Sequence, residues 1–183
     1  MVINDCEIEQ VHKAKLLGVM LSDELNWNDH VKYLVGKASK RLYSLKLLKR
    51  AGVRQDALVN YFCSSVRSVL EYSCQLWSTS LTGEQSEALE QIQRRALKII
   101  CPGLDYESAI EATSLKLLSV RRVDLCKKFF LSVVRDDTNV LFKHLNRRAS
   151  PYPTRNQTKF SLPLVKTKRF KSSFMVHGLY SRQ

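Results

Sequence analysis

The chain has 183 residues, of which 44% are hydrophobic, and it carries 30 Lys and Arg against 17 Asp and Glu. This composition excludes a wholly disordered chain, and the net charge of +13 favours either a polyanionic partner or simple solubility. Five widely spaced cysteines without a Cys-x-x-Cys pair favour reduced thiols over a zinc site. Neither a signal peptide nor an apolar run of membrane-spanning length is present. We therefore expect a protein of the nucleus or cytoplasm that is not secreted and has no membrane partner.

Residues 1–21 are rich in β-branched side chains. Val2 and Ile3, followed by Asn4-Asp5 and then Ile8 and Val11, predict a short hairpin. Residues 14–21 (AKLLGVML) predict one further strand. Because a single hairpin has too little sheet to bury a face, it must pack on the helices that follow or on partners outside this chain.

The hydrophobic period becomes helical after Trp27. We expect a helix over 28–50, capped by Asn28 or Asp29 and ended by Gly52. Its apolar stripe comprises Val31, Leu34, Val35, Ala38, Leu42 and Leu45. A second helix is expected over about 56–77.

Thr82 and Gln85 have the spacing of a capping box, so they predict a third helix that ends before Pro102-Gly103. A short helix over about 105–113 follows, and Ser119 is expected to cap the next one. The predicted fold is mainly α, with a small N-terminal hairpin, a helical bundle and a basic tail.

The tail, 138–183, contains ten Lys and Arg, no Asp or Glu, and three of the four prolines. This composition predicts an extended basic arm. We therefore divide the chain into 1–22, 23–137 and 138–183.

Catalytic patterns are weak in this sequence. The one adjacent carboxylate pair, Asp136-Asp137, follows an amphipathic helix and precedes Thr-Asn, which indicates a helix end and loop rather than a two-metal site. No nucleophile elbow, phosphate-binding loop or paired-histidine zinc motif occurs, and His30 at a helix start favours capping or packing. We assign no catalytic or metal residue and no cofactor.

Binding has more support, because cations interleaved with aromatic rings suit phosphates and bases. The segment 28–50 holds seven Lys and Arg, with Tyr33 and Tyr43 beside them. The alternative is a solvated positive face with core tyrosines. We treat Arg94-Arg95 and Arg121-Arg122 as ion-pair partners of Glu90 and Asp124. The candidate nucleic-acid-binding residues are Lys37, Lys40, Arg41, Lys46, Lys49, Arg50, Lys168, Arg169 and Lys171.

Four blocks of the sequence resemble the C-terminal region of non-LTR, LINE-like (jockey-type) retrotransposon reverse transcriptases, in the family's order. They are KLLGVMLSDELNWNDHVKYLVGKASKRLYSLKLLKRAGV (15–53), SVRSVLEYSCQLWSTSLTGEQSEALEQIQRRALKII (65–100), SLKLLSVRRVDLCKKFF (114–130) and TKRFKSSF (167–174).

The resemblance implies a remnant of palm strands over 1–22 and a thumb and connection region over 23–137. It also implies a template–primer duplex of DNA or RNA as partner, gripped through its backbone, together with the fingers and palm of the parent polymerase. In that family the catalytic aspartates, which would use Mg, lie upstream of such a segment. We therefore expect a fragment of an RNA-directed DNA polymerase that cannot add nucleotides by itself.

Three other interpretations stay open. The chain could be a general nucleic-acid-binding protein, a small enzyme, or an inert remnant with Val2, Ile3, Leu17 and Val19 exposed. Residues 30–52 also resemble a block in AlkB-type dioxygenase/methyltransferases, but no His-x-Asp or His-x-Glu iron motif accompanies it.

Overall fold

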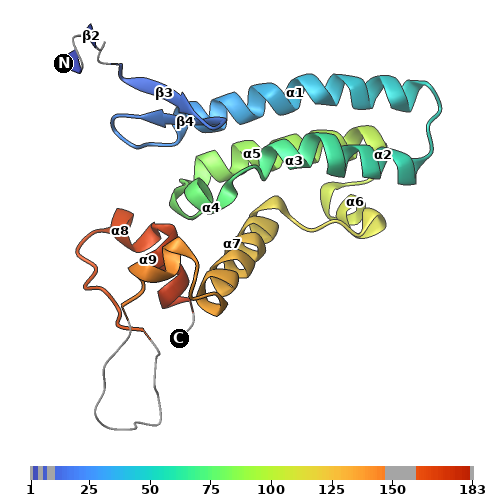
Figure 1. Ribbon diagram of the computed structural model, residues 1–183. Coiled ribbons are helices and arrows are strands. Elements are labelled where there is room, and N and C mark those ends of the chain that lie inside the picture. Colours follow the sequence, from blue (N-terminus) through green and yellow to red (C-terminus); the bar gives the residue numbers. More distant parts are fainter. Residues whose placement is uncertain (1, 4–5, 8–10, 147–159, 182–183) are drawn as a thin grey trace, which may run out of the picture. The chain divides into compact units, whose positions relative to one another are not determined.

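The structure is a computed structural model that describes residues 2–3, 6–7, 11–146 and 160–181. Its chain forms two compact units (Figure 1). Unit 1 comprises Met1–Tyr72 and Thr82–Leu115, and unit 2 comprises Ser73–Leu81 and Lys116–Gln183. These units do not follow the expected division at 22 and 137, since each takes two separate stretches of chain. The coarse prediction of a mainly helical protein with a small hairpin near the N-terminus is confirmed.

Unit 1 begins with two antiparallel strand pairs. In the first, β1 (Val2–Ile3) pairs with β2 (Cys6–Glu7). The Asn4-Asp5 turn expected there, and the expected exposure of Val2 and Ile3, lie outside the described residues. In the second, β3 (Lys13–Leu16) pairs with β4 (Val19–Ser22).

The prediction of one strand over 14–21 was wrong, because the chain reverses at Leu17-Gly18. Both residues have positive φ, 47° and 84°, as a two-residue hairpin turn requires. The turn places Leu17 in solvent, 84% exposed, while Val19 packs inward at 4%. Of the exposure expected for an inert remnant, Leu17 agrees and Val19 does not.

The long helix α1 (Asn28–Arg50) matches the predicted bounds. Its start differs, because Trp27 is the N-cap and neither Asn28 nor Asp29 caps it. Its end is as expected: Gly52 adopts φ 78°, and the amides of Gly52 and Val53 donate to the carbonyls of Lys49 and Leu48. His30 is fully buried, and its Nδ1 accepts from the Met20 amide at 3.3 Å, which confirms a packing role.

The second predicted helix is interrupted. It comprises α2 (Gln55–Tyr61), the π-helical segment η1 (Phe62–Arg67) and α3 (Ser68–Leu70). After Ser73, whose φ is 49°, a separate short helix α4 (Cys74–Trp77) and the 3₁₀ turn η2 (Ser78–Ser80) belong to unit 2.

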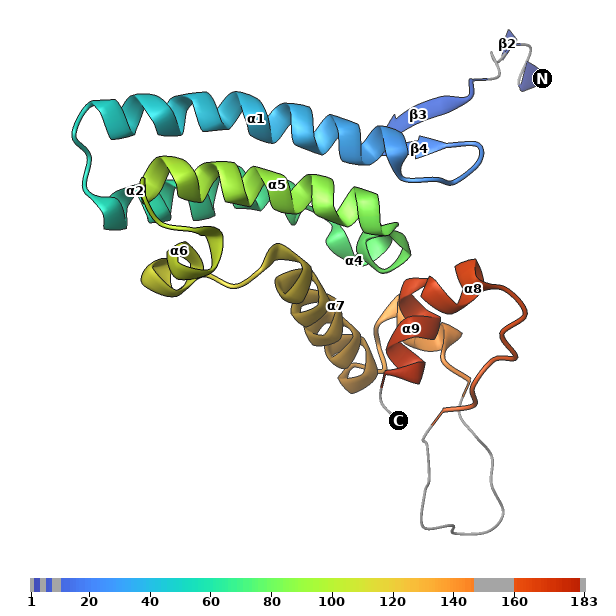
Figure 2. The ribbon, with the colours of Figure 1, turned by 180° about the vertical axis from the view of Figure 1, so that it is seen from behind.

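The third helix, α5 (Gly83–Ile100), carries the predicted capping box. The Gln85 amide donates to Thr82 Oγ1 at 3.2 Å, and the Thr82 amide donates to Gln85 Oε1 at 2.9 Å. Helices α1 and α5 run side by side in the same direction (Figure 2), as Gln85 bonds Asn28 near one end and Lys49 bonds Ile100 near the other. Asp105 caps α6 (Tyr106–Thr113).

The core of unit 1 lies among α1, α2–α3 and α5. Its fully enclosed side chains recur at helical spacing, so the apolar stripes face one another. They include Leu34, Ala38, Leu45, Leu58, Phe62, Val66, Leu89, Ile92, Ala96 and Ile100.

Unit 2 is built on α7 (Leu118–Arg135), whose N-cap is Leu117 and not the predicted Ser119. The 3₁₀ turn η3 (Val140–His144) and the helices α8 (Lys168–Ser172) and α9 (Phe174–Tyr180) complete it. Within the described residues, no helix combines the length and apolar character needed to cross a bilayer.

The prediction of a largely extended tail was wrong over 168–180, where α8 and α9 form, whereas 161–166 have no helix or strand. Phe160 is 6% exposed and joins Phe130, Val133 and Leu145 in one apolar cluster, against which α9 packs. The basic composition of the tail masked the few aromatic and aliphatic residues that pack against α7, including Phe160 and Phe174. The tail residues 147–159 lie outside the described part.

Candidate nucleic-acid interface

A groove of about 450 Å³ opens in unit 1 beside the β3–β4 turn, α1 and α3. We call it the Tyr33 groove. Basic and aromatic side chains line it together with the backbone of the turn, and none of the described residues that line it is acidic. Its polar and aromatic side chains are Lys15, Tyr33, Lys37, Arg41, Ser68 and Tyr72.

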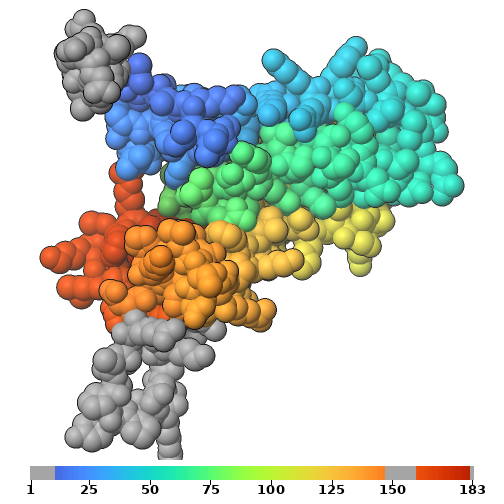
Figure 3. All heavy atoms as spheres, in the orientation of Figure 1, coloured from blue at the N-terminus to red at the C-terminus, as the bar shows by residue number. Residues whose placement is uncertain are grey.

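The helical repeat of α1 brings three of these side chains onto one face. Tyr33, Lys37 and Arg41 are four residues apart, so they follow one another along the helix surface. Lys15 reaches the same place from β3, and Tyr72 reaches it from the turn that follows α3. Figure 3 shows the blue hairpin and the cyan-to-green helices of unit 1 as one continuous surface.

Lys15 and Lys37 share the Tyr33 ring. Lys15 Nζ donates to Tyr33 Oη at 3.0 Å and lies 4.6 Å from the ring centroid, while Lys37 Nζ lies 5.8 Å from it. The hydrogen bond from Lys15 lowers the pKa of Tyr33 below its usual value. The ring thus holds two ammonium groups close together while both stay in solvent.

Tyr72 fixes the turn at the other wall. Its hydroxyl donates to the Leu17 carbonyl at 2.9 Å, and its ring passes so close to Gly18 that a Cβ there would lie 3.2 Å from Cε1. The ring is half exposed. Glycine suits position 18 for two reasons: it adopts a positive φ without strain, and it has no Cβ to crowd the Tyr72 ring.

Arg41 is partly committed to the fold. Its Nη1 donates to the Ser65 carbonyl within the π-helical segment η1, and its side chain is half buried. A guanidinium has five donors, so Arg41 can bond the Ser65 carbonyl while offering other donors to a ligand.

A second groove, of about 400 Å³, lies where α1 meets α5. We call it the Tyr43 groove. Tyr43, 64% exposed, stands beside Lys46 from α1 and beside Arg95 and Lys98 from α5. Arg95 Nη1 donates to Ser39 Oγ at 3.5 Å. As in the Tyr33 groove, no acidic side chain is found among its described lining residues.

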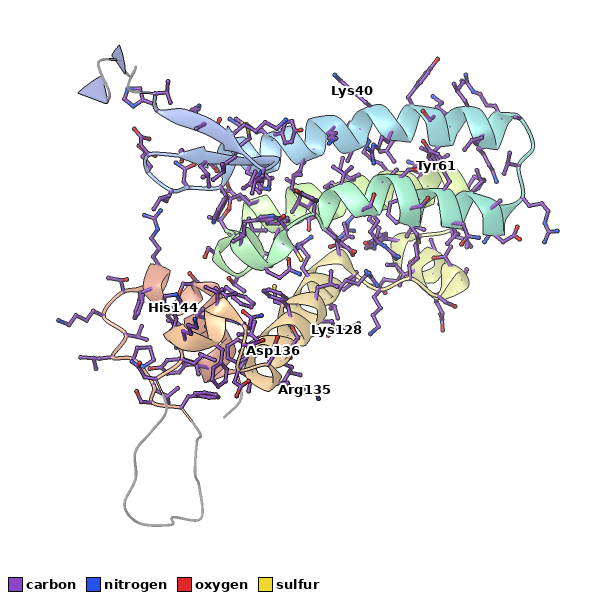
Figure 4. All side chains as sticks on the ribbon, viewed as in Figure 1. Lys40, Tyr61, Lys128, Arg135, Asp136 and His144 are labelled. Atoms are coloured by element: carbon purple, nitrogen blue, oxygen red, sulfur yellow. The ribbon has the colours of Figure 1, made fainter. Side chains whose placement is uncertain are left out.

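Three of the predicted cations on α1 lie outside both grooves. Lys40 is exposed and points away from the neighbouring helices (Figure 4). Lys49 donates to the Ile100 carbonyl at 3.0 Å, so it caps the end of α5. Arg50 is exposed at the last turn of α1. Of the six candidates on this helix, the structure brings Lys37 and Arg41 together in one groove and places Lys46 in the other.

The remaining candidates, Lys168, Arg169 and Lys171, are exposed on α8 in unit 2. They form a cationic segment separate from α1. Thr167 caps this short helix through the Phe170 amide at 3.2 Å, so the cations project from a folded turn rather than from an extended arm.

Sequence reasoning missed four residues of the grooves. Lys15 lies on β3 and Tyr72 lies in the turn that follows α3. The sequence was interpreted as a continuous strand at the first place and a continuous helix at the second, so no pattern pointed to these residues. Arg95 and Lys98 are three residues apart, so they lie on one face of α5, and that face borders the basic residues of α1. That spacing was the available signal for these two.

The arginine pairs were only partly as expected. Arg94 Nε lies 3.6 Å from Glu87, not Glu90, and its guanidinium stacks 4.3 Å from the centroid of Tyr106. Glu90 instead accepts from the Tyr106 hydroxyl. Likewise Asp124 pairs with Lys116 at 3.2 Å, and Arg122 is buried.

The acidic pair lies at the C-terminal end of α7, as predicted (Figure 4). Asp136 Oδ1 accepts from the Thr138 amide at 3.0 Å and from its hydroxyl at 2.6 Å, and both carboxylates are exposed. Across the described residues, no three His, Cys, Asp or Glu side chains gather where they could hold a metal ion.

The geometry of unit 1 therefore suits a ligand with several negative charges and some flat surface. Comparisons with protein-family models, curated proteins and solved structures found no match, so the case for any function rests on the residues described above.

Proposed function

We propose that unit 1 binds the sugar–phosphate backbone of a nucleic-acid duplex without regard to sequence. The observation that carries this proposal is the Tyr33 groove, where Lys15, Lys37 and Arg41 meet two tyrosine rings and no acidic lining residue. A groove lined by positive charge attracts a polyanion and disfavours cations.

The local acids do not cancel this charge. Asp29 is paired with Lys13 at 2.9 Å, and Glu71 lies 3.9 Å from Arg67, so each is balanced by a cation outside the groove. Lys15 and Lys37 are exposed and can follow phosphates at variable spacing, as backbone binding requires.

We further propose that the chain derives from the thumb and connection region of a LINE-like reverse transcriptase. The four blocks of resemblance support this origin, and a grip on template–primer is the role it implies. In that setting the nucleotide chemistry and its Mg belong to the fingers and palm of such a polymerase. Reading the genomic frame upstream for a Phe/Tyr-x-Asp-Asp block tests the origin separately from binding.

The double substitution Lys15→Glu/Lys37→Glu tests the groove. We expect the Kd for a 20-base-pair RNA–DNA hybrid, measured by fluorescence anisotropy at about 50 mM salt, to rise at least about tenfold. The slope of log K against log salt should fall by about 2, because two phosphate contacts are lost.

The matched control is Lys128→Glu/Lys143→Glu in unit 2, which makes the same change of charge at two exposed positions. If the control weakens binding as much as the groove variant, the effect is one of net charge and the groove is not the site. Extension of a primer by the wild-type chain would also contradict the proposal.

A second candidate, an inert remnant, is favoured by Leu16, Leu17 and Leu25, which are 59%, 84% and 58% exposed at one end of unit 1. It predicts no binding of the hybrid at about 50 mM salt and self-association through the apolar residues. Analytical ultracentrifugation of the full chain, with and without hybrid, separates it from the first candidate.

A further inference from the structure

Unit 2 brings together two cysteines that are distant in the sequence. Cys74 lies on α4 and Cys126 on α7, and both are buried, at 0% and 4% exposure. The Cys126 thiol donates to the backbone carbonyl of Cys74 at 3.8 Å, and its Sγ lies 3.2 Å from Ser78 Oγ, so the two cysteines are spatial neighbours. The fold thus places two cysteines that are 52 residues apart beside each other on neighbouring helices.

A small cavity leads to this pair. It encloses about 190 Å³ between α7 and α9 and is lined by Cys126, Phe130, Leu131, Phe174 and Gly178, with Lys127, His177 and Ser181. The lining is mostly apolar, so the cavity suits a small neutral molecule and excludes a nucleic acid. Cys126 lines it and Cys74 does not, so the two sulfurs differ in access.

The surroundings of Cys126 favour its thiolate. The neighbouring Cys74 side chain, then the Ser78 hydroxyl and the charge of Arg122, outweigh burial and lower the pKa of Cys126 below its usual value. Cys101 shows the opposite case, because burial raises the pKa of its thiol. A thiolate is the nucleophilic form of cysteine.

We propose that Cys126 is a site of oxidation by hydrogen peroxide, and that Cys74 converts the product to a Cys74–Cys126 disulfide. The cavity admits the oxidant to Cys126, and the contact on α4 supplies the second thiol. The proposal is independent of nucleic-acid binding, since all of its residues belong to unit 2.

The chemistry takes two steps. The Cys126 thiolate attacks one peroxide oxygen, the O–O bond breaks, and hydroxide leaves as water after protonation, so the sulfur becomes a sulfenic acid. The Cys74 sulfur then attacks Sγ of Cys126, the S–O bond breaks, and a second water leaves as the S–S bond forms. Two thiols and one peroxide give one disulfide and two waters.

The experiment treats the full chain with peroxide, alkylates the remaining thiols and maps tryptic peptides by mass spectrometry. The four described cysteines fall in separate peptides, 55–67, 68–94, 99–116 and 123–127. Cys6 is replaced by serine throughout, because its side chain lies outside the described residues. We expect a crosslink between 68–94 and 123–127, while the Cys63 and Cys101 peptides remain alkylated.

Two variants assign the roles. Cys74→Ser should leave Cys126 as a sulfenic acid that dimedone traps, and Cys126→Ser should leave Cys74 reduced under the same treatment. Cys101→Ser is the matched control, a buried thiol whose removal should leave the crosslink unchanged. Cys126 should react about tenfold faster than Cys101.

Three results would overturn the proposal: equal reaction rates for Cys126 and Cys101, a disulfide that joins Cys126 to another cysteine, or trapping of Cys74 instead of Cys126. Circular dichroism before treatment checks that each variant is folded.

Discussion

The Tyr33 groove of unit 1 and the cavity of unit 2 differ in almost every property that decides what can enter. The groove is open, lined by cations and tyrosines, and floored by polar turn backbone. The cavity is less than half its volume, is lined mostly by apolar side chains, and has a buried thiol on its wall. A basic chain can thus present a cationic groove on one unit and an apolar cavity on the other.

The groove and the cavity both follow from which side chains a helix places on each of its faces. On α1, cations at spacings of four residues stay outside because the apolar stripe occupies the opposite face. On α7, aromatic residues meet the small Gly178 of α9, where a Cβ would lie only 2.4 Å from the Phe130 ring. The close contact between Phe130 and Gly178 lies beside a cavity that the side chains of α7 and α9 leave unfilled.

The largest expected effect comes from removing the main wall of the cavity. Phe130→Ala should lower the free energy of unfolding by about 3–5 kcal/mol, because Phe130 is 2% exposed and anchors the cluster of Val133, Leu145 and Phe160. Urea unfolding followed by circular dichroism measures it.

The adjacent Phe129, 37% exposed, is the matched control, and Phe129→Ala should cost about 1 kcal/mol or less. Binding of the RNA–DNA hybrid at low temperature should change less than about twofold in both variants. A loss of binding that parallels the loss of stability would mean that the two units do not act separately.

A middle-sized effect is expected from the groove. Tyr33→Ala should weaken hybrid binding by about 1 kcal/mol, or about fivefold, because the ring that holds Lys15 and Lys37 is lost. Tyr33→Phe keeps the ring and should lose less than half of that. Anisotropy titrations measure both.

Tyr43→Ala makes the same change in the Tyr43 groove. An equal loss in that variant would extend the binding surface to both sides of α1, whereas no loss in Tyr33→Ala would remove the ring from the proposed interface.

The last effect is a pH dependence of stability that belongs to unit 1. Burial lowers the pKa of His30 below its usual 6.5, so the fold favours the neutral ring. As the pH falls through about 6.5 the unfolded chain takes up the proton first, and stability is lost with decreasing pH, by at most about 1.4 kcal/mol per pH unit for one proton.

Urea unfolding at pH 7.5 and at pH 5.5 tests this dependence. His30→Gln should flatten it, and His144→Gln, at an exposed ring, is the control. A slope that persists unchanged in His30→Gln would assign it to other groups.

The regular parts of unit 1 were predictable from local signals. The stripe from Val31 to Leu45, the capping box of Thr82 and Gln85, and the stop at Gly52 are each encoded within a few residues. The turn at Leu17-Gly18 was not, because leucine seldom adopts positive φ and only the contact with Tyr72 shows why it does so here.

The candidate site was predictable to the same degree. Helical spacing could select Lys37 and Arg41 as neighbours on one face. It could not show that Lys49 bonds a backbone carbonyl, because that carbonyl is 51 residues away in the sequence. Unit 2 was least predictable, since Phe160 and Phe174 are isolated aromatics in a basic stretch and only long-range packing gives them partners.

The division of unit 2 into two stretches of chain also orders events during synthesis. Unit 1 has all of its residues once Leu115 has been made, whereas α4, with the fully enclosed Trp77, must wait for α7 to emerge. During that interval of several seconds, at about 5–20 residues per second, the indole is without its final cover. Chaperone binding to the nascent chain should therefore centre on the short helix in the middle of the sequence and not on the long basic one.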